Sequence, residues 1–292
     1  MNRIKGILYA AVSSSTFGLA PFFSITLLLA GFSAFEVLSY RWGVASIVLI
    51  VFGWLSGCNF RLAGKDWGVV FLLSLLRAVT SFSLIIAYQN IASGVASTIH
   101  FMYPLAVALA MMFFFREKKS LLVILAVLMS LLGAALLSLG ELEAKSGNTM
   151  VGLVAACVSV FSYAGYIVGV RTTRAVQINS TALTCYVMGL GTIFYLIGAY
   201  CTSGLQLVSE GYTWLIILGL ALPATAISNI TLVQAIKYAG PTLTSILGAM
   251  EPLTAVVIGV FVFKELFTVN SAVGIILILL AVSIVVFRRQ KS

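Results

Sequence analysis

Long apolar runs separated by short polar segments dominate the chain. Ten of these runs are long enough to cross a hydrocarbon core of about 30 Å. They cover residues 4–29, 34–56, 67–89, 94–115, 119–139, 150–171, 179–201, 212–234, 241–263 and 269–287. The runs are unbroken, whereas the strands of a membrane barrel would give short segments of alternating polarity. The pattern therefore predicts an all-α polytopic membrane protein with ten transmembrane helices.

Composition supports this prediction, because 61% of the residues are hydrophobic and only 9% are charged, against about 25% charged in soluble domains. If the N-terminus is cytoplasmic, 13 of the 17 lysines and arginines face inside. Lys145 and Lys264 face outside, and Arg41 and Arg77 lie within helices. We therefore expect cytoplasmic N- and C-termini in a bacterial inner membrane. The same asymmetry explains the net charge of +9 without a nucleic-acid partner.

The two halves of the chain resemble each other at a displacement of 148 residues. The segment "ASTIHFMYPLAVALAMMFFFRE" aligns with "TSILGAMEPLTAVVIGVFVFKE", so that Pro104 meets Pro252 and Glu117 meets Glu265. We interpret residues 1–145 and 146–292 as two repeats of five helices. Because five is odd, the second repeat must enter the membrane inverted. Inverted repeats are typical of transporters that open alternately to either side, whereas a channel needs a polar pore lining that is scarce here.

Three segments carry a resemblance to a known family. "YPLAVALAMMFFFRE", "EPLTAVVIGVFVFKE" and "LSYRWGVASIVL", the last containing Arg41, are similar to EamA-type members of the drug/metabolite transporter superfamily. The resemblance covers nearly all of the chain. It implies a central cavity lined mainly by helices 1, 3, 4, 6, 8 and 9, with helices 5 and 10 more peripheral. It does not name a solute, because such proteins export amino acids, drugs and assorted metabolites.

Glu251 is an acidic residue inside an otherwise apolar run. It lies ten residues into the ninth helix, which puts it about 15 Å deep, at the bilayer midplane. A carboxylate facing lipid there would be costly, so we expect it to point into the bundle. It is a candidate for proton coupling and solute binding, and a structural pairing with a base is the alternative.

Two prolines and a glycine are candidate hinges: Pro104 in the fourth helix and Gly248 and Pro252 in the ninth. Pro252 has no backbone N–H to donate, so we expect the carbonyl one turn earlier, near Gly248, to be free for an ion, water or solute. Bending at these positions would let the two helices move during transport.

Of the remaining candidates, His100 lies at the corresponding depth in the fourth helix and Arg77 near the middle of the third, whereas Arg41 lies about eight residues from the outer end of the second. His100, the only histidine, is a second candidate for coupling, because histidine titrates near neutral pH, although it could equally be a hydrogen-bonded core residue. Arg77 stays charged and must meet an anion, either Glu251 or a solute carboxylate. Arg41 could reach toward the membrane interface or hold helices together. Aromatic and amide side chains complete the predicted solute-binding set: Phe17, Tyr103, Tyr163, Tyr166 and Asn229.

We find no metal cluster, phosphate-binding loop or nucleophile with a histidine at motif spacing, so we expect no cofactor and no enzymatic activity. Our hypothesis is a secondary active transporter that exports small amphipathic metabolites such as amino acids, with protons as a candidate coupling ion. An uncoupled facilitator or exchanger of uncharged or aromatic solutes is the alternative. A membrane enzyme or receptor is the alternative outside transport. The expected partners are the solute and the lipid bilayer, and a homodimer is left open.

Overall fold

The computed structural model describes residues 2–91, 93–117, 120–138, 147–202, 204–261 and 268–288, and within these ranges the chain is helical, without a strand. The elements are α1 (Asn2–Phe17), α2 (Ala20–Leu29), α3 (Ala34–Leu55), η1 (Gly64–Asp66), α4 (Trp67–Asn90), α5 (Ser93–His100), α6 (Tyr103–Phe113), α7 (Leu121–Ser138), α8 (Thr149–Thr172), η3 (Arg174–Gln177), α9 (Ser180–Cys201), α10 (Gly211–Ala221), the π-helix η4 (Leu222–Ile227), α11 (Ser228–Ala239), α12 (Pro241–Leu247), α13 (Met250–Phe261) and α14 (Val269–Arg288).

These helices confirm the predicted membrane protein. Seven helical segments of the described chain are long and apolar enough to span a bilayer, and the apolar helices of α7 and α14 are shorter. Large apolar side chains cover the outer surface; Trp54, for example, is 78% exposed and Phe161 72%. Such a surface suits lipid and would be unfavourable in water. The eighth predicted run, 212–234, extends further than expected, because α11 continues to Ala239.

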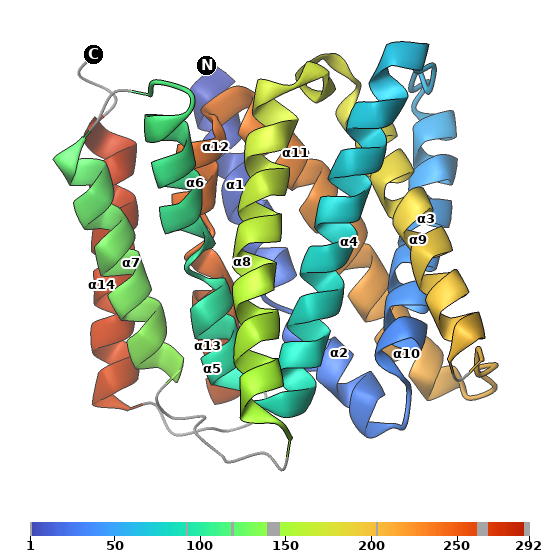
Figure 1. Cartoon of the computed structure of the whole chain (residues 1–292). Coiled ribbons are helices and arrows are strands. Elements are labelled where there is room, and N and C mark those ends of the chain that lie inside the picture. The colour runs from blue at the N-terminus through green and yellow to red at the C-terminus, as the bar shows by residue number, and fades with distance from the viewer. Residues whose placement is uncertain are drawn as a thin grey trace.

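Four sets of helices pack side by side (Figure 1). Helix α4 lies along α8 and contacts α5, and α6 also contacts α8; these four form the α4 group. Helix α1 lies along α11 and contacts η4, α12 and α13; these five form the α1 group. Helix α3 pairs with α9, and α7 pairs with α14. Each pairing joins an element of residues 1–145 to one of residues 146–292, so the two halves of the chain pack against each other throughout the bundle. The division into two repeats stays a prediction.

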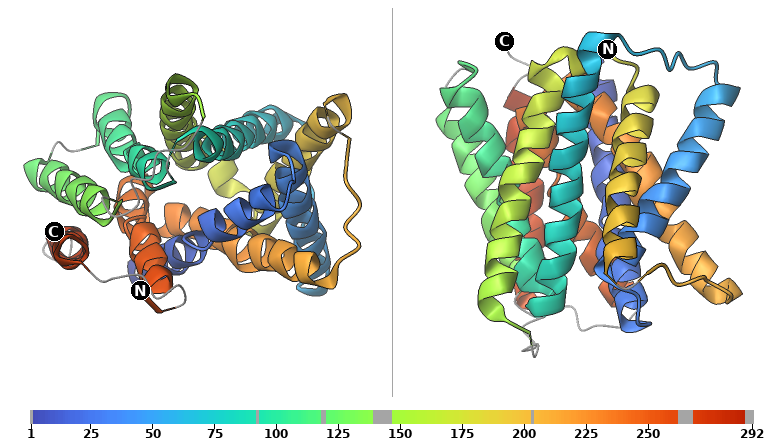
Figure 2. Two further views of the ribbon diagram at one scale, coloured as in Figure 1. Left: turned by 90° about the horizontal axis from the view of Figure 1, so that it is seen from below. Right: turned by 45° about the vertical axis from the view of Figure 1, so that its right-hand side comes forward.

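Helices α7 and α14 lie together at one edge of the bundle (Figure 2, left). This place agrees with the peripheral role that the family resemblance implies for the fifth and tenth helices. The beginning of α1 and the end of α14 lie at the same end of the bundle, called the terminal end below (Figure 1). Helix α1 begins at the terminal end and runs away from it, whereas α8 runs toward it and ends there (Figure 1).

Four of the ten spans are interrupted near their middle. The first breaks at Gly18–Leu19, the fourth at Phe101–Met102 and the ninth at Gly248–Ala249, and the eighth widens into η4. A proline follows each of the three breaks by two to four residues, and another lies in the first turn of the π-helix. A proline ring clashes with the carbonyl one turn earlier, and this clash disturbs the helix. The spans α4 and α8 are continuous. The α1 group is therefore built around distorted helices and the α4 group around two straight ones.

One expectation about the ninth span is wrong. The carbonyl of Gly248 is not left free by Pro252, because the backbone N–H of Glu251 donates to it at 2.8 Å. The chain tightens at Gly248–Ala249 and so closes this hydrogen bond three residues apart. Lys118, Glu141–Lys145, Lys264 and Glu265, which carried parts of the orientation and repeat arguments, lie outside the described residues.

Polar contacts join the α4 group to the α1 group at the terminal end. The Arg171 side chain donates to the carbonyl of Lys237 at 3.0 Å, linking α8 to α11. The Thr242 hydroxyl donates to the Glu117 carboxylate at 2.6 Å, linking α12 to the segment after α6. At the opposite end, two described polar contacts do not join these two groups. Glu36 of α3 accepts from the backbone of Gln206, and Asn90 of α4 accepts from the backbone of Asn148 at the start of α8.

Candidate functional site

Buried aromatic side chains meet at the centre of the bundle, where α5, α6 and α8 of the α4 group face α1. We call Phe17, His100, Tyr103, Tyr163 and Tyr166 the aromatic cluster; each is at most 7% exposed. The Tyr163 ring lies 4.6 Å from that of Tyr103, 5.4 Å from that of His100 and 6.5 Å from that of Tyr166. Phe17 ends α1 and Tyr103 begins α6, so each of these two side chains lies beside a break in its span.

Arg77 is buried against this cluster from the middle of α4. Its guanidinium carbon lies 4.9 Å from the Tyr163 ring centroid and 5.3 Å from that of Phe17, which is within the range of cation–π attraction. Its Nε donates to Asn229 Oδ1 at 3.0 Å, and an Nη donates to Ser81 at 3.4 Å. In the described chain no carboxylate lies within ion-pair distance of Arg77. Rings and neutral oxygens, rather than Glu251, therefore hold this charge.

Glu251 meets the cluster through Tyr103, whose hydroxyl donates to its Oε1 at 3.4 Å. Two glycines permit this approach. A Cβ at Gly248 would overlap the Tyr103 hydroxyl, and one at Gly18 would lie 2.6 Å from the Glu251 carbonyl oxygen. The breaks of the first and ninth spans thus set the position of the carboxylate.

His100 is held from α8, because its Nδ1 lies 2.8 Å from the Ser159 hydroxyl. Its Nε2 is buried without a hydrogen-bond partner, as is the Tyr166 hydroxyl. Buried polar atoms are nearly always paired, so such atoms are candidates for contact with a water or a bound solute. In the described chain, no cluster of three or more histidine, cysteine or acidic residues could hold a metal ion.

Arg41 is a functional candidate that sequence reasoning did not place in the site. It is 4% exposed, and its Nε donates to the Thr225 hydroxyl at 2.6 Å. Thr225 lies in η4, where it in turn donates to the Leu220 carbonyl at 2.7 Å. Thr225 and Asn229, one turn apart on the same span, thus accept from two arginines on two different helices. The available sequence signal is the proline in "LPATAI", which indicates a disturbed helix but does not specify a π-turn; π-turns themselves often mark functional sites.

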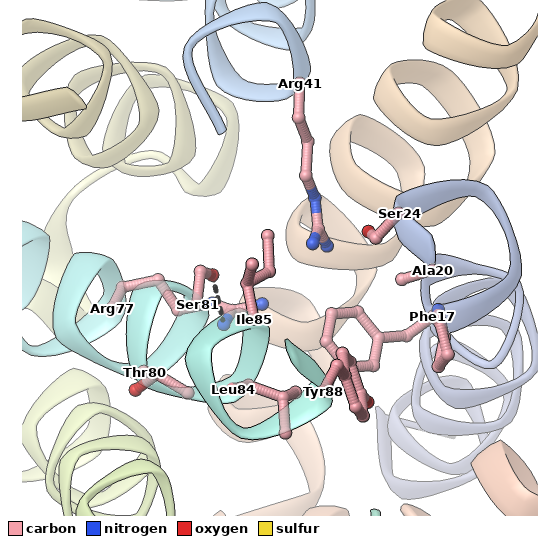
Figure 3. Close-up of a pocket in the computed structure, with 11 residues that line it drawn as sticks. Phe17, Ala20, Ser24, Arg41, Arg77, Thr80, Ser81, Leu84, Ile85 and Tyr88 are labelled. Carbon is pink, nitrogen blue, oxygen red and sulfur yellow. Dashed lines mark hydrogen bonds between the residues drawn. The ribbon is translucent and has the colours of Figure 1, made fainter. Parts of the chain in front are cut away.

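A pocket opens beside the aromatic cluster, between α2, α3 and α4 (Figure 3). Its cavity volume is about 20 Å³, which is room for about one water molecule, and it lies in the half of the bundle away from the terminal end. In Figure 3 the Arg41 guanidinium points from α3 into the space between Ser24 and Ile85. The lining residues are Phe17, Ala20, Pro21, Ser24, Arg41, Arg77, Thr80, Ser81, Leu84, Ile85 and Tyr88. They include two cations and no acid.

The structure brings the sequence-predicted residues together at the bundle centre. Seven contact one another through the aromatic cluster or Arg77, and Glu251 joins them through Tyr103. Pro104 and Pro252 lie beside the breaks of the fourth and ninth spans. Only Phe17 and Arg77 of the predicted set also line the pocket.

This chain is similar to known transporters in sequence and to a solved structure in fold. A family model described as the EamA-like transporter family matches residues 4–139 and again 150–287. A curated protein of Archaeoglobus fulgidus, described as an uncharacterized transporter, is 28% identical over 238 residues, covering 80% of this chain and 83% of that protein. A solved crystal structure matches with a TM-score of 0.80 at 18% identity, covering 100% of this chain and 99% of that one. At that identity the likeness shows the fold alone.

Proposed function

The chain is a membrane transporter that belongs to the EamA-like transporter family, and we propose that it exports small amphipathic metabolites, such as amino acids, by proton-coupled alternating access. The observation that carries this proposal is the mixed lining of the bundle centre. The Arg77 guanidinium contacts aromatic rings there, and the Glu251 carboxylate joins the same rings through Tyr103. A solute with a charged part and an apolar part would find partners for both.

The pocket has a cavity volume of only about 20 Å³ in this conformation, far below that of ligand pockets in proteins. The proposal therefore requires the helices around the pocket to move apart when a solute binds. The lining of the pocket is apolar at Phe17, Leu84 and Ile85. It carries hydroxyl groups at Ser24 and Ser81.

Alternating access is supported by the difference between the two ends of the bundle. The contacts of Arg171 and Thr242 bridge the α4 and α1 groups at the terminal end, whereas the pocket lies in the other half. With both termini cytoplasmic, as proposed from the basic residues, this conformation corresponds to one closed toward the cytoplasm. Breaking the bridging contacts and closing the pocket would give the opposite state.

Proton coupling is proposed for Glu251, with His100 as the second candidate. Glu251 contacts the aromatic cluster through Tyr103, and both residues lie beside a break in their span. If those breaks change between states, the carboxylate changes neighbours and thus its proton affinity. A difference in affinity between states is what couples one ligand to another.

The test is solute uptake into liposomes containing the purified protein, with amino acids, their amines and organic cations as probes. We expect saturable uptake of at least one amphipathic probe and faster movement when a pH gradient is imposed. Uptake that ignores the gradient would favour the uncoupled facilitator or exchanger. An active, folded protein that moves none of the probes would contradict the proposal and favour a membrane enzyme or receptor.

A further inference from the structure

Two arginines face the same small pocket without a carboxylate to neutralise them. The guanidinium carbons of Arg41 and Arg77 lie 5.6 Å and 5.3 Å from the centroid of the same Phe17 ring. Both side chains are at most 4% exposed. The ion pair between Asp66 and Arg174 lies outside the bundle core. Two like charges buried together are costly, so a structure that keeps both points to an anion between them.

Arg41 is the group that remains available. The Arg41 Nε donates to the Thr225 hydroxyl, but the Arg41 Nη2 is buried and has no hydrogen-bond partner. Arg77 is more nearly satisfied, since Asn229 and Ser81 accept from it. An unpaired guanidinium nitrogen inside a membrane protein leaves a strong donor without an acceptor, which an arriving oxyanion would correct.

Figure 3 places this donor at the pocket. The Arg41 side chain enters from α3, with the Ser24 hydroxyl of α2 on one side and α4 on the other. Phe17, Leu84 and Ile85 make the adjoining surface apolar. The pocket thus offers one cationic pole and one apolar wall.

We propose that Arg41 forms a carboxylate subsite, assisted by Arg77, and that the transported solute is a monocarboxylate with an apolar body. This inference rests on the proposed transport function and narrows its solute class. The planar fork of arginine matches a carboxylate, and a small pocket with few further donors suits that group better than a phosphate, which needs more donors. Arg41, rather than Glu251, would then set which solutes enter.

The first test is binding to the purified protein in detergent, measured as the increase in thermal unfolding temperature with ligand concentration. The probes share a phenyl ring: 3-phenylpropionate, 2-phenylethylamine and phenyl phosphate, with chloride as the inorganic anion. We expect stabilisation by 3-phenylpropionate at concentrations where the other three have little effect. Equal or stronger stabilisation by the amine, by the phosphate or by chloride would overturn the carboxylate subsite, and so would no effect of the carboxylate.

Variants then assign the effect to Arg41. Loss of a hydrogen bond to a charged group should weaken 3-phenylpropionate binding about 10- to 100-fold in Arg41→Gln, with a smaller loss in Arg41→Lys, which keeps the charge without the fork. Arg61→Gln, at an exposed arginine outside the membrane span, is the matched control and should bind as the parent does. Unchanged binding in folded Arg41→Gln contradicts the assignment. If that variant does not fold, the probe series on the parent protein still decides.

Uptake into liposomes separates this inference from the proposed function. Binding of 3-phenylpropionate without uptake of any probe would leave the subsite standing and contradict transport. Saturable uptake with no preference for the carboxylate probe would leave transport standing and contradict the subsite.

Discussion

Glu251 is the residue at which proton coupling can be tested most directly. Replacing it with glutamine keeps its size and its ability to accept from Tyr103 but removes the titration. We expect Glu251→Gln to bind solute and to lose most of the acceleration caused by an imposed pH gradient in liposomes. Glu210→Gln, at an exposed carboxylate, is the control and should respond as the parent does. A full response by Glu251→Gln would transfer the coupling role to His100.

Sequence reasoning located most of the central residues because a charged or titratable residue inside an apolar run is visible without a structure. Arg77, His100 and Glu251 are found in this way, by depth along their helices. The partners of these residues could not be found in this way. Asn229, rather than Glu251, accepts from Arg77, and Tyr103, rather than an arginine, donates to Glu251. Arg41 was underestimated, because its distance from the helix end suggested the interface. Only the packing of α3 against η4 buries it beside Thr225.

At the level of helices, close backbone contact between the first and ninth spans depends on Gly18. A Cβ there would lie 2.6 Å from the Glu251 carbonyl oxygen and 2.9 Å from the Thr254 Cβ. Because both neighbours are helix atoms that cannot rotate away, we expect Gly18→Ala to lower stability by about 1–3 kcal/mol and to impair uptake. Thermal unfolding in detergent measures the first effect and liposome uptake the second.

Gly43→Ala in α3 is the matched control for this substitution. Its added Cβ would meet only the Thr192 methyl, at 3.4 Å, and alanine favours helix more than glycine does. Its stability should therefore equal or exceed that of the parent. If Gly18→Ala is as stable and active as Gly43→Ala, the close approach of α1 to α13 is not required.

The ten spans could be predicted because apolar runs of sufficient length have few alternatives in a bilayer. Bending points in the fourth and ninth spans were also expected, from Pro104, Gly248 and Pro252, although the spans are broken there rather than bent. The break at Gly18–Leu19 and the π-helix at Leu222–Ile227 were not, although Pro21 and Pro223 lie beside them. Proline indicates that a helix is disturbed, but whether it kinks, breaks or widens depends on the helix packed against it. Helices α4 and α8 contain no proline and are continuous.

For the molecule as a whole, the bridge between Thr242 and Glu117 is expected to hold the terminal end closed. Thr242→Val removes a hydrogen bond to a charged group, which is worth about 1.5–3 kcal/mol, so the population should shift toward the opposite state. A Ser24→Cys reporter in the pocket would then react more slowly with a thiol reagent added from the side of the pocket. Thr231→Val, which loses only hydrogen bonds to the carbonyls of Ile227 and Ser228 in its own span, should leave that rate unchanged. An unchanged or faster rate in Thr242→Val would contradict this role of the bridge.

The orientation of the whole bundle can be tested with three of its own cysteines. Cys58 follows α3 at the terminal end, and Cys201 closes α9 at the opposite end (Figure 2). Cys157 is exposed on α8 within a membrane span. Since basic residues favour cytoplasmic termini, variants that each retain one cysteine should differ toward an impermeant maleimide. Intact cells should label Cys201, permeabilised cells should label Cys58 as well, and the bilayer should protect Cys157 in both. A cysteine introduced at Lys118 should follow Cys58, and one within Glu141–Lys145 should follow Cys201. Labelling of Cys58, but not of Cys201, on intact cells would reverse the orientation. The pocket would then face the cytoplasm, and this conformation would be the one that exchanges solute with the cytoplasm.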